Sequence, residues 1–211
     1  MSETEGRKAL VKYGELLYTR KLAFGTGGNI SLRVGKDRIL ITPSGACKGF
    51  LRGKDLIPMS ISRGAVIGDG RPSIEAPFHL AFYRNREEVG AVMHTHPVSC
   101  TALAVAGVAV RPGLTPEGLL VLGEVPLVAY ATPGTKELAD RLEDSMKGGA
   151  DAFVLERHGA ITVGKDLEEA FQRMETLEFV AAVQLKAMSV GRARDLGQKE
   201  KNTILRLRQK Q

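Results

Sequence analysis

The sequence predicts a single-domain α/β sandwich in which helices flank a mostly antiparallel central sheet. Three observations favour this fold class. The chain has 211 residues, which suits one domain, and 43% of them are hydrophobic, enough for a sizeable core. The predicted elements run in the order helix, β-meander, and then mixed strands and helices. The sequence contains no internal repeat and no low-complexity tract.

The first half of the chain supplies a helix followed by antiparallel strands. Apolar residues at helical spacing predict a helix over residues 4–23, with Thr4 as its N-cap. Apolar runs and turn signals predict four strands, at residues 30–34, 38–42, 56–61 and 89–96. Ser73 is expected to cap a helix that runs to about residue 86.

The second half alternates strands and helices. Helices are predicted over residues 98–105, 135–147 and 167–190, and strands over residues 125–129, 152–156 and 160–163. Residues 107–123 have no clear period and include six Gly or Pro residues, which predicts a loop across the surface. Asp166 caps the last helix and Gly191 ends it. We therefore expect one domain over residues 1–191 and a tail over residues 192–211.

The tail carries most of the positive charge. The formal net charge is +6, and residues 192–211 hold seven Lys/Arg against two Asp/Glu. Such a tail can bind nucleic acid, form a solvated helix end or dock on a neighbouring subunit. It has no aromatic residue for base stacking, so we expect no nucleic-acid partner.

The remaining bulk features favour the cytoplasm. No run approaches the ~18 apolar residues of a membrane span, and the polar, acidic N-terminus is unlike a secretory signal. The two cysteines, Cys47 and Cys100, form no C-x-x-C pair. We expect a cytoplasmic protein with reduced thiols and no membrane partner.

Two of the four histidines lie close together, after an apolar run that is typical of a strand. Side chains alternate along a strand, so His94 and His96 share one face, and Pro97 ends the strand there. The pair could be two hydrogen-bonded surface histidines, or it could hold a divalent cation. Catalytic zinc usually takes three protein ligands and keeps one open position, so a third ligand elsewhere in the chain would favour the metal site over two surface histidines.

His158 is the third ligand that we predict. It ends a predicted buried strand and precedes Gly159, which lets the backbone turn and present the ring. His79 lies inside a predicted helix beside apolar residues, so we expect it to be packed and hydrogen bonded. Glu75 lies in the predicted first turn of that helix, where the helix dipole favours a carboxylate, and is the candidate acid–base.

Three clusters of small polar residues can bind an anion through backbone N–H groups and short side chains: residues 25–29, residues 43–45 and Ser73. The first cluster follows a helix, and its spacing does not fit the dinucleotide fingerprint. Each cluster alone is an ordinary turn. Together with a metal site they predict a phosphate pocket.

These motifs, in this order and spacing, resemble the class II, zinc-dependent sugar-phosphate aldolases of the L-fuculose-1-phosphate aldolase type. The resemblance runs from about Arg7 to Val190 and also includes a segment at residues 130–135. It depends on five stretches, which are residues 25–31, residues 41–45, Pro72-Ser73-x-Glu75, His94-x-His96 and His158-Gly159. The set is specific for the superfamily, in which epimerases, dehydratases and decarboxylases share it.

The resemblance implies an α/β catalytic domain over residues 1–191 and a role for each motif. His94, His96 and His158 would hold one Zn²⁺, and Glu75 would be a fourth ligand that moves off to act as base and acid. The substrate phosphate would be held by Gly28, Asn29, Ser44, Gly45 and Ser73. The family is usually a homotetramer with its sites between subunits.

The activity implied is cleavage of a ketose 1-phosphate to dihydroxyacetone phosphate and a short aldehyde, through an enediolate stabilised by the metal. The alternatives are a decarboxylase, dehydratase or 4-epimerase of the superfamily, or a metal-free binding module on the same fold. Glu75 favours the aldolase over the 4-epimerase branch, which resembles Pro-Ser-x-Asp at this segment. In two places the sequence departs from the family. Ile74 replaces a serine of the phosphate loop. The fuculose type also has two tyrosines for the aldehyde, one in the surface loop and one in the C-terminal tail, but here Thr115 stands near the first position and no tyrosine follows Gly191.

Overall fold

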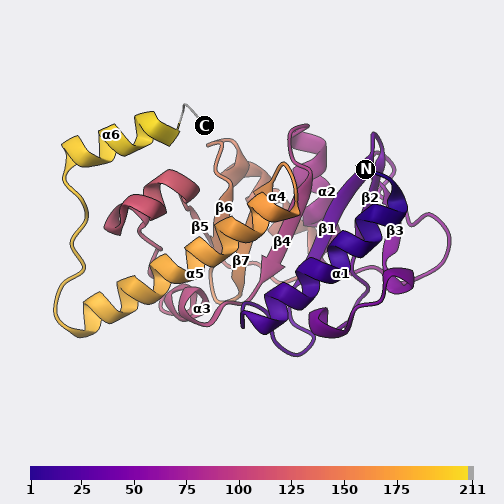
Figure 1. Ribbon diagram of the computed structural model, residues 1–211, viewed down its shortest axis with the longest axis horizontal. Helices are drawn as coiled ribbons and strands as arrows, with labels where there is room; N and C mark the ends of the chain where they lie inside the picture. The colour runs from indigo at the N-terminus through magenta and orange to yellow at the C-terminus, as the bar shows by residue number, and fades with distance from the viewer. Residues whose placement is uncertain (209–211) are drawn as a thin grey trace.

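The computed structural model describes residues 1–208 and has one seven-stranded sheet between two layers of helices (Figure 1). Its strand order is β3-β2-β1-β4-β7-β6-β5. The strands are β1 (Asn29–Gly35), β2 (Arg38–Ile41), β3 (Ile57–Ser60), β4 (Ala91–Thr95), β5 (Leu127–Val128), β6 (Ala152–Leu155) and β7 (Gly159–Gly164). Among these strands only β5 and β6 pair in parallel, which confirms the prediction of a mostly antiparallel sheet.

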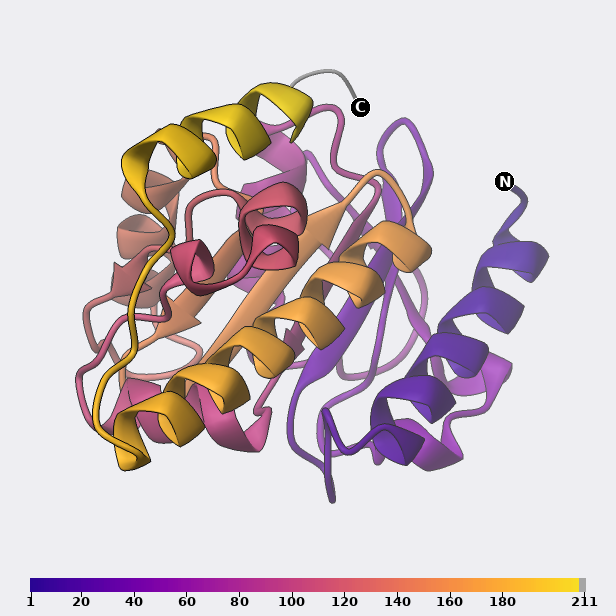
Figure 2. The same ribbon diagram turned by 60° about the vertical axis from the view of Figure 1, so that its left-hand side comes forward.

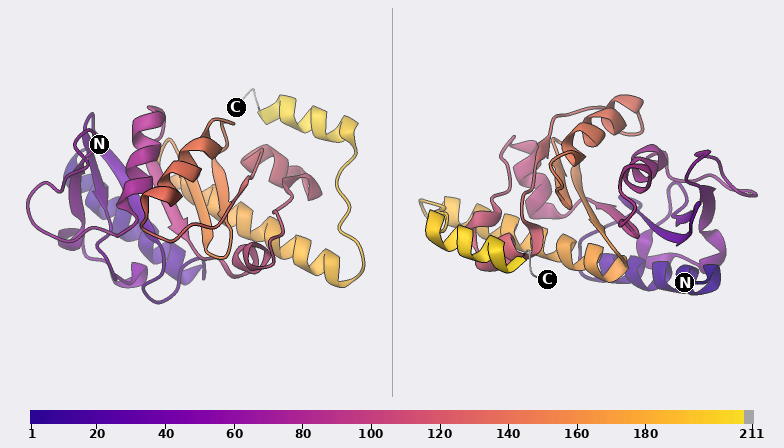
Figure 3. Two further views of the ribbon diagram at one scale, coloured as in Figure 1. Left: turned by 180° about the vertical axis from the view of Figure 1, so that it is seen from behind. Right: turned by 90° about the horizontal axis from the view of Figure 1, so that it is seen from above.

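Helices cover both faces of this sheet (Figure 3, right). They are α1 (Glu3–Thr19), α2 (Ala76–Asn85), α3 (Val98–Val105), α4 (Lys136–Met146), α5 (Leu167–Ser189) and α6 (Gln198–Arg208). Strand residues alternate between two buried clusters: Met93 packs with α1, α3 and α5, whereas its neighbour Val92 packs with α2 and α4. His94 therefore faces the α2 side of β4, and the α/β sandwich is confirmed.

The N-terminus of α1 differs from the prediction. Ser2, not Thr4, is the N-cap, and α1 ends at Thr19 rather than near residue 23. The Ser2 hydroxyl accepts from the Glu5 N–H, and the Glu5 carboxylate accepts from the Ser2 N–H. This reciprocal capping box satisfies two backbone donors at once, which a cap at Thr4 would not.

The start of α2 also differs. The helix begins at Ala76, so Glu75 occupies the N-cap position instead of the first turn. Ser73 does not cap the helix, and its hydroxyl accepts from the Glu75 N–H at 3.2 Å. The two residues thus share a short turn that fixes the backbone of Glu75 just before the helix.

Residues 107–123 were predicted to form a loop, but they contain two short helical segments. They include the short 3-10 segment η3 (Pro112–Leu114) and one π-helical turn, η4 (Gly118–Leu122). Leu119 and Leu122 are buried, and Gly118 lets the turn approach Val180 of α5 closely. A single π turn has neither the 3.6-residue nor the two-residue period, so a periodicity search does not detect it.

The chain beyond Gly191 folds back on the body of the protein through α6, which lies beside η4 (Figure 2). Asp195 pairs with Arg111 and Lys201, and the Leu196 N–H donates to the Gly113 carbonyl. The described part of the predicted tail is therefore docked on its own chain, and its last three residues lie outside the described residues. No helix within residues 1–208 combines the length and the hydropathy that a membrane crossing requires.

Candidate metal centre and its carboxylate

The structure brings the three predicted histidines together. His94 lies on β4, His96 follows the strand, and His158 lies in the turn from β6 to β7. Because β4 and β7 are neighbours, this turn reaches the end of β4. The ring centroids are 4.8 Å apart for His94 and His96 and 4.7 Å apart for His94 and His158, and one nitrogen from each ring lies within 4.8 Å of the others.

The three imidazoles are in the state that binds a metal ion. Burial lowers the pKa of all three: that of His94 falls well below its usual value and that of His158 falls to about 4. The His94 Nδ1–H donates to the Ala160 carbonyl at 2.9 Å, so Nε2 carries the lone pair and accepts from His96 Nε2 at 3.1 Å. At pH 7 the site therefore offers neutral rings, the form that ligates divalent cations.

Glu75 completes the cluster from the start of α2. Its Oε2 lies 3.3 Å from His94 Nε2, and its Oε1 lies 3.4 Å from His158 Nε2. Burial raises the pKa of this carboxyl, while the Asn29 hydrogen bond and the charge of Lys48 act in the opposite direction. Oε1 is buried and has no hydrogen-bond partner within residues 1–208. A buried carboxylate oxygen without a partner, beside neutral imidazoles, fits a cation held at this point.

A buried hydrogen-bond chain orients Glu75. The Asn29 Nδ2 donates to Glu75 Oε2 at 2.7 Å, so its Oδ1 is left to accept from His79 Nε2–H at 2.5 Å. His79 Nδ1 then accepts from the Ser31 hydroxyl at 2.6 Å, and Ser31 in turn bonds the Tyr83 hydroxyl at 2.8 Å. Burial lowers the pKa of His79 to about 3, so it is a neutral link in this chain and not a ligand, as expected.

The predicted phosphate residues lie on loops that adjoin this centre. Gly28 adopts a φ of 76°, and a Cβ there would stand 2.5 Å from the His94 carbonyl oxygen, so the first loop lies directly on β4. The second loop is joined to residues 71–73 by two backbone hydrogen bonds. The Ser44 N–H donates to the Arg71 carbonyl, and the Ser73 N–H donates to the Thr42 carbonyl. Within residues 1–208 the N–H groups of Gly28 and Gly45 donate to no protein acceptor.

Lys48 is a buried residue of this region that the sequence analysis missed. It starts the 3-10 segment η1 (Lys48–Phe50). Its ammonium donates to two backbone carbonyls of the first loop and to the carbonyl of Ala46, directly after the second loop. The sequence carries no signal for this position, because a single lysine in a loop is usually a solvated surface residue.

The end of β4 is also fixed by a distant carboxylate. Pro97 precedes α3 and offers no side-chain cap, so the first N–H groups of α3 need other acceptors. Glu178 of α5 accepts from the Ser99 and Cys100 N–H groups, both at 2.9 Å. The residues that follow His96 are thereby held in place.

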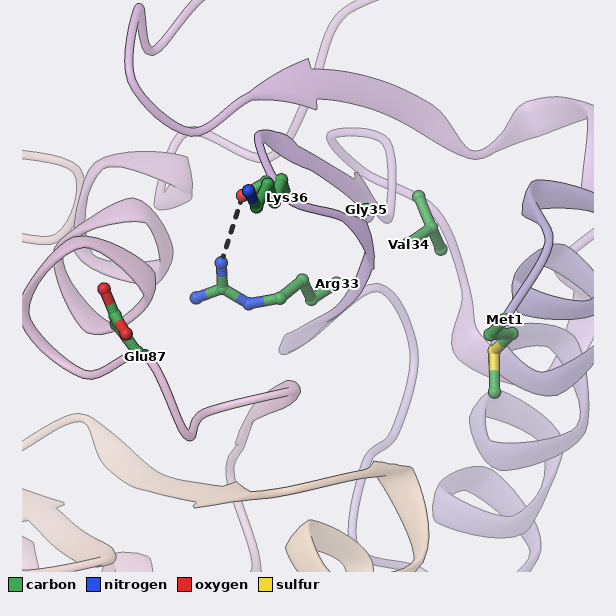
Figure 4. A pocket seen from close by; sticks show the side chains of 6 residues that line it. All are labelled: Met1, Arg33, Val34, Gly35, Lys36 and Glu87. Atoms are coloured by element: carbon green, nitrogen blue, oxygen red, sulfur yellow. Dashed lines mark hydrogen bonds between the residues drawn. The ribbon is translucent and has the colours of Figure 1, made fainter.

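A cavity of about 450 Å³ lies elsewhere, at the other end of β1 (Figure 4). Its lining residues are Met1, Arg33, Val34, Gly35, Lys36 and Glu87. The Arg33 guanidinium donates to the carbonyl oxygens of Val89, Lys36 and Tyr83, and none of the predicted site residues lines the cavity. The cavity and the histidine centre are therefore separate features.

The fold and the centre define an α/β protein with three neutral histidines and a buried carboxylate at one end of the sheet. Residues 8–185 match the family described as Class II Aldolase and Adducin N-terminal domain. The chain belongs to this class II aldolase family, which confirms the resemblance and the prediction of an aldolase-family enzyme.

Curated relatives within the family carry two different names. The chain is 37% identical over 179 residues to the L-fuculose phosphate aldolase of Methanocaldococcus jannaschii, covering 85% of this chain and 95% of that protein. It is also 37% identical over 185 residues to the 3-oxo-tetronate 4-phosphate decarboxylase of Pectobacterium atrosepticum, covering 85% and 84%.

Solved structures agree on the fold over nearly the full length. An L-fuculose 1-phosphate aldolase structure has a TM-score of 0.90 at 31% identity, covering 98% of this chain and 97% of the other. The L-fuculose-1-phosphate aldolase from Thermus thermophilus has a TM-score of 0.77 at 33% identity, covering 90% and 97%. The family likeness therefore extends to the three-dimensional arrangement of the sheet and helices.

Proposed function

We propose that this protein is a zinc-dependent aldolase that reversibly cleaves a ketose 1-phosphate, of the fuculose, rhamnulose or ribulose type, to dihydroxyacetone phosphate and a short aldehyde. The observation that carries the proposal is the convergence of three neutral histidines on a buried carboxylate with an unpartnered oxygen. The names of the aldolase relatives support the same substrate class.

His94, His96 and His158 hold the ion, with Glu75 as the fourth group in the resting site. When bound, zinc supplies the Lewis acid that stabilises the negative charge formed as the carbon–carbon bond breaks. Three nitrogen ligands and one carboxylate are a donor set of the kind that zinc takes in proteins.

Glu75 is the acid–base of this proposal. Burial raises the pKa of the carboxyl, which makes it a stronger base than a solvated glutamate. Asn29 holds one carboxylate oxygen, and His79 holds Asn29, so the orientation of Glu75 is set by the buried hydrogen-bond chain.

The phosphate is held by the three loops. The N–H groups of Gly28 and Gly45 and the hydroxyl groups of Ser44 and Ser73 are the donors that we assign to it. The Asn29 amide gives one N–H to Glu75 and its oxygen to His79, so its second N–H is the donor that we assign to the phosphate.

A homotetramer with sites at subunit boundaries is part of the proposal. Exposed apolar side chains flank the site loops: Phe24 precedes the first loop, and Ile74 and Tyr130 are 56% and 45% exposed. Such residues fit an interface between copies of the chain. Light scattering at micromolar concentration tests it, since an active monomer would contradict it.

A decarboxylase of a 3-oxo sugar acid phosphate is the second candidate. The 37% identity to a protein with that name equals the identity to the aldolases. Ile74, which replaces a family serine, also makes the loop around the phosphate differ from the aldolase pattern.

Turnover of the two substrates distinguishes the candidates, whereas proton exchange tests the enediolate chemistry that both reactions need. An aldolase needs no aldehyde to enolise dihydroxyacetone phosphate, so metal-loaded protein in deuterated water should exchange one C3 proton stereospecifically, as followed by NMR. Chelation should abolish the exchange, and zinc should restore it. If the loaded protein releases CO₂ from 3-oxo-tetronate 4-phosphate but releases no dihydroxyacetone phosphate from ketose 1-phosphates, the aldolase proposal is wrong.

A further inference from the structure

Lys48 lies where a lysine is rarely found. Its side chain is 1% exposed, although lysine is almost never fully buried unless it is paired. Its backbone packs closely against α1 at Gly14, because a Cβ added to that glycine would stand only 2.7 Å from the Lys48 carbonyl oxygen. The ammonium is therefore held beneath the site loops by the packing of α1 against η1.

The ammonium joins two loops that are distant in sequence. It donates to the carbonyl oxygens of Thr26 at 2.8 Å and Gly28 at 2.6 Å in the first loop. It also donates to the carbonyl oxygen of Ala46 at 2.6 Å, directly after the second loop. All three N–H bonds of the ammonium are used, so both loops are fixed relative to each other by one group.

The positive charge itself is not neutralised by the protein. The three acceptors are uncharged, and within residues 1–208 Lys48 makes no ion pair. Burial lowers the pKa of Lys48 to about 8, while Cys47 and Glu75 act to raise it, so the ammonium remains charged at pH 7. Neutral donors would satisfy the same carbonyls without the desolvation penalty of a buried, unpaired ion.

The charge is close enough to act on the neighbouring centre. Two causes lower the pKa of His96: burial is the larger, and the charge of Lys48 is the second. Gly27 brings the first loop against that ring, since a Cβ there would stand 2.9 Å from His96 Nδ1. Lys48 and the histidines therefore lie on either side of the same loop.

We propose that Lys48 is a positioning residue for the anionic group of the substrate: its ammonium locks the loops at residues 26–28 and 46 together and leaves a net positive charge beneath them. The inference rests on the proposed function in assigning the phosphate to these loops. It extends that function by naming a group, outside the donors of the phosphate pocket, that controls how tightly a phosphorylated substrate binds.

Exchange kinetics with a charged and an uncharged substrate test the proposal. For Lys48→Met in the metal-loaded full chain, we expect the KM for dihydroxyacetone phosphate to rise roughly 10–100-fold. The kcat should stay within about threefold, and kcat/KM for unphosphorylated dihydroxyacetone should not change. A purely structural role would damage the reactions of both substrates. Lys54→Met, which removes an exposed lysine six residues away, is the matched charge control and should behave as wild type.

A measurement on the unaltered protein covers the case in which Lys48→Met does not fold. Wild type labelled with ¹⁵N-lysine and loaded with zinc is titrated with inorganic phosphate at pH 7. The Lys48 ammonium resonance, distinguished by slow proton exchange, should shift and saturate with phosphate but not with sodium chloride at equal ionic strength. No shift while calorimetry detects phosphate binding would overturn the inference.

The proposed function and the role of Lys48 fail in different ways. If wild type binds neither inorganic phosphate nor dihydroxyacetone phosphate, the proposed function is wrong and the role of Lys48 with it. If wild type binds both and a folded Lys48→Met has an unchanged KM, only the inference about Lys48 is wrong.

Discussion

Two buried clusters of charged side chains lie at opposite ends of the β4–β7 pair. At one end, Asp151 accepts from Arg86 at 2.7 Å and lies 3.0 Å from guanidinium nitrogens of both Arg173 and Arg208. Arg86 and Arg173 also donate to backbone carbonyls. Each polar group of this cluster has partners within the chain.

At the other end the pairing is incomplete. Glu75 Oε1 and His158 Nδ1 are buried without a hydrogen-bond partner, and the Lys48 ammonium donates only to backbone carbonyls and forms no ion pair among the described residues. Native proteins leave few such groups unsatisfied unless they serve a ligand. From this comparison we infer that the Asp151 cluster stabilises the fold, while the unsatisfied groups of the Glu75 cluster are kept for a ligand.

The largest expected effect lies in the incompletely paired cluster. Glu75→Gln keeps the shape and the hydrogen-bonding capacity but loses the base, so deuterium exchange into dihydroxyacetone phosphate should fall by ~10²–10⁴-fold. Glu88→Gln, which changes a carboxylate beside Arg86 in the other cluster, is the matched control. Equal exchange rates in the two variants would remove Glu75 from the chemistry.

The paired cluster should respond in stability instead. Asp151→Asn leaves three arginines around a neutral group, and the free energy of unfolding should fall by about 3 kcal/mol. Urea denaturation followed by circular dichroism measures this. Exchange activity per folded chain should stay at the wild-type value, and its loss would contradict the division of roles between the clusters.

The pH dependence of stability sharpens the comparison further. The pKa of His79 is about 3 in the folded chain and about 6.5 when unfolded, so the unfolded state takes the proton first as the pH falls. Its contribution to stability is present above pH 6.5 and is lost as the pH falls from 6.5 toward 3. In metal-free protein, His79→Gln should make the slope of unfolding free energy between about pH 5.5 and 4.5 shallower by about 1.4 kcal/mol per pH unit. An unchanged slope would contradict burial of a neutral His79.

The smallest effect is expected at the edge of the paired cluster. Arg208 is one of three guanidinium groups around Asp151 and is partly exposed, so Arg208→Ala should change the unfolding free energy by only about 0–1 kcal/mol. Thermal and urea unfolding measure this. A loss as large as that of Asp151→Asn would mean that α6 is integral to the fold.

The features that the sequence predicts well are those with a local cause. Strand alternation places His94, and the breakers Pro97 and Gly159 place the turns that expose His96 and His158 at one end of the sheet. The seven strands likewise follow from apolar runs between turn residues, and short turns account for the β1–β2 and β6–β7 hairpins.

The features that it misses depend on contacts between distant segments. Lys48 meets Gly28 across 20 residues, and His79 meets Asn29 across 50, so no short pattern identifies either pair. The start of α2 was misplaced because the Ser73–Glu75 hydrogen bond competes with a helix cap at Ser73. The extent of the domain and the roles of the site residues stay predictions.

The carboxylate of Glu178 has a consequence for the order of events during synthesis. The α3 amides that it binds are 78 residues earlier in the chain, and His158 is itself far downstream of β4. At about 5–20 residues per second, a ribosome needs roughly 4–16 s to make that stretch. Until then β4 lacks its terminal anchor and the histidine centre lacks its third imidazole, so we expect nascent chains to acquire the proposed ion only late in translation. Chains arrested before residue 158 should retain no zinc after gel filtration.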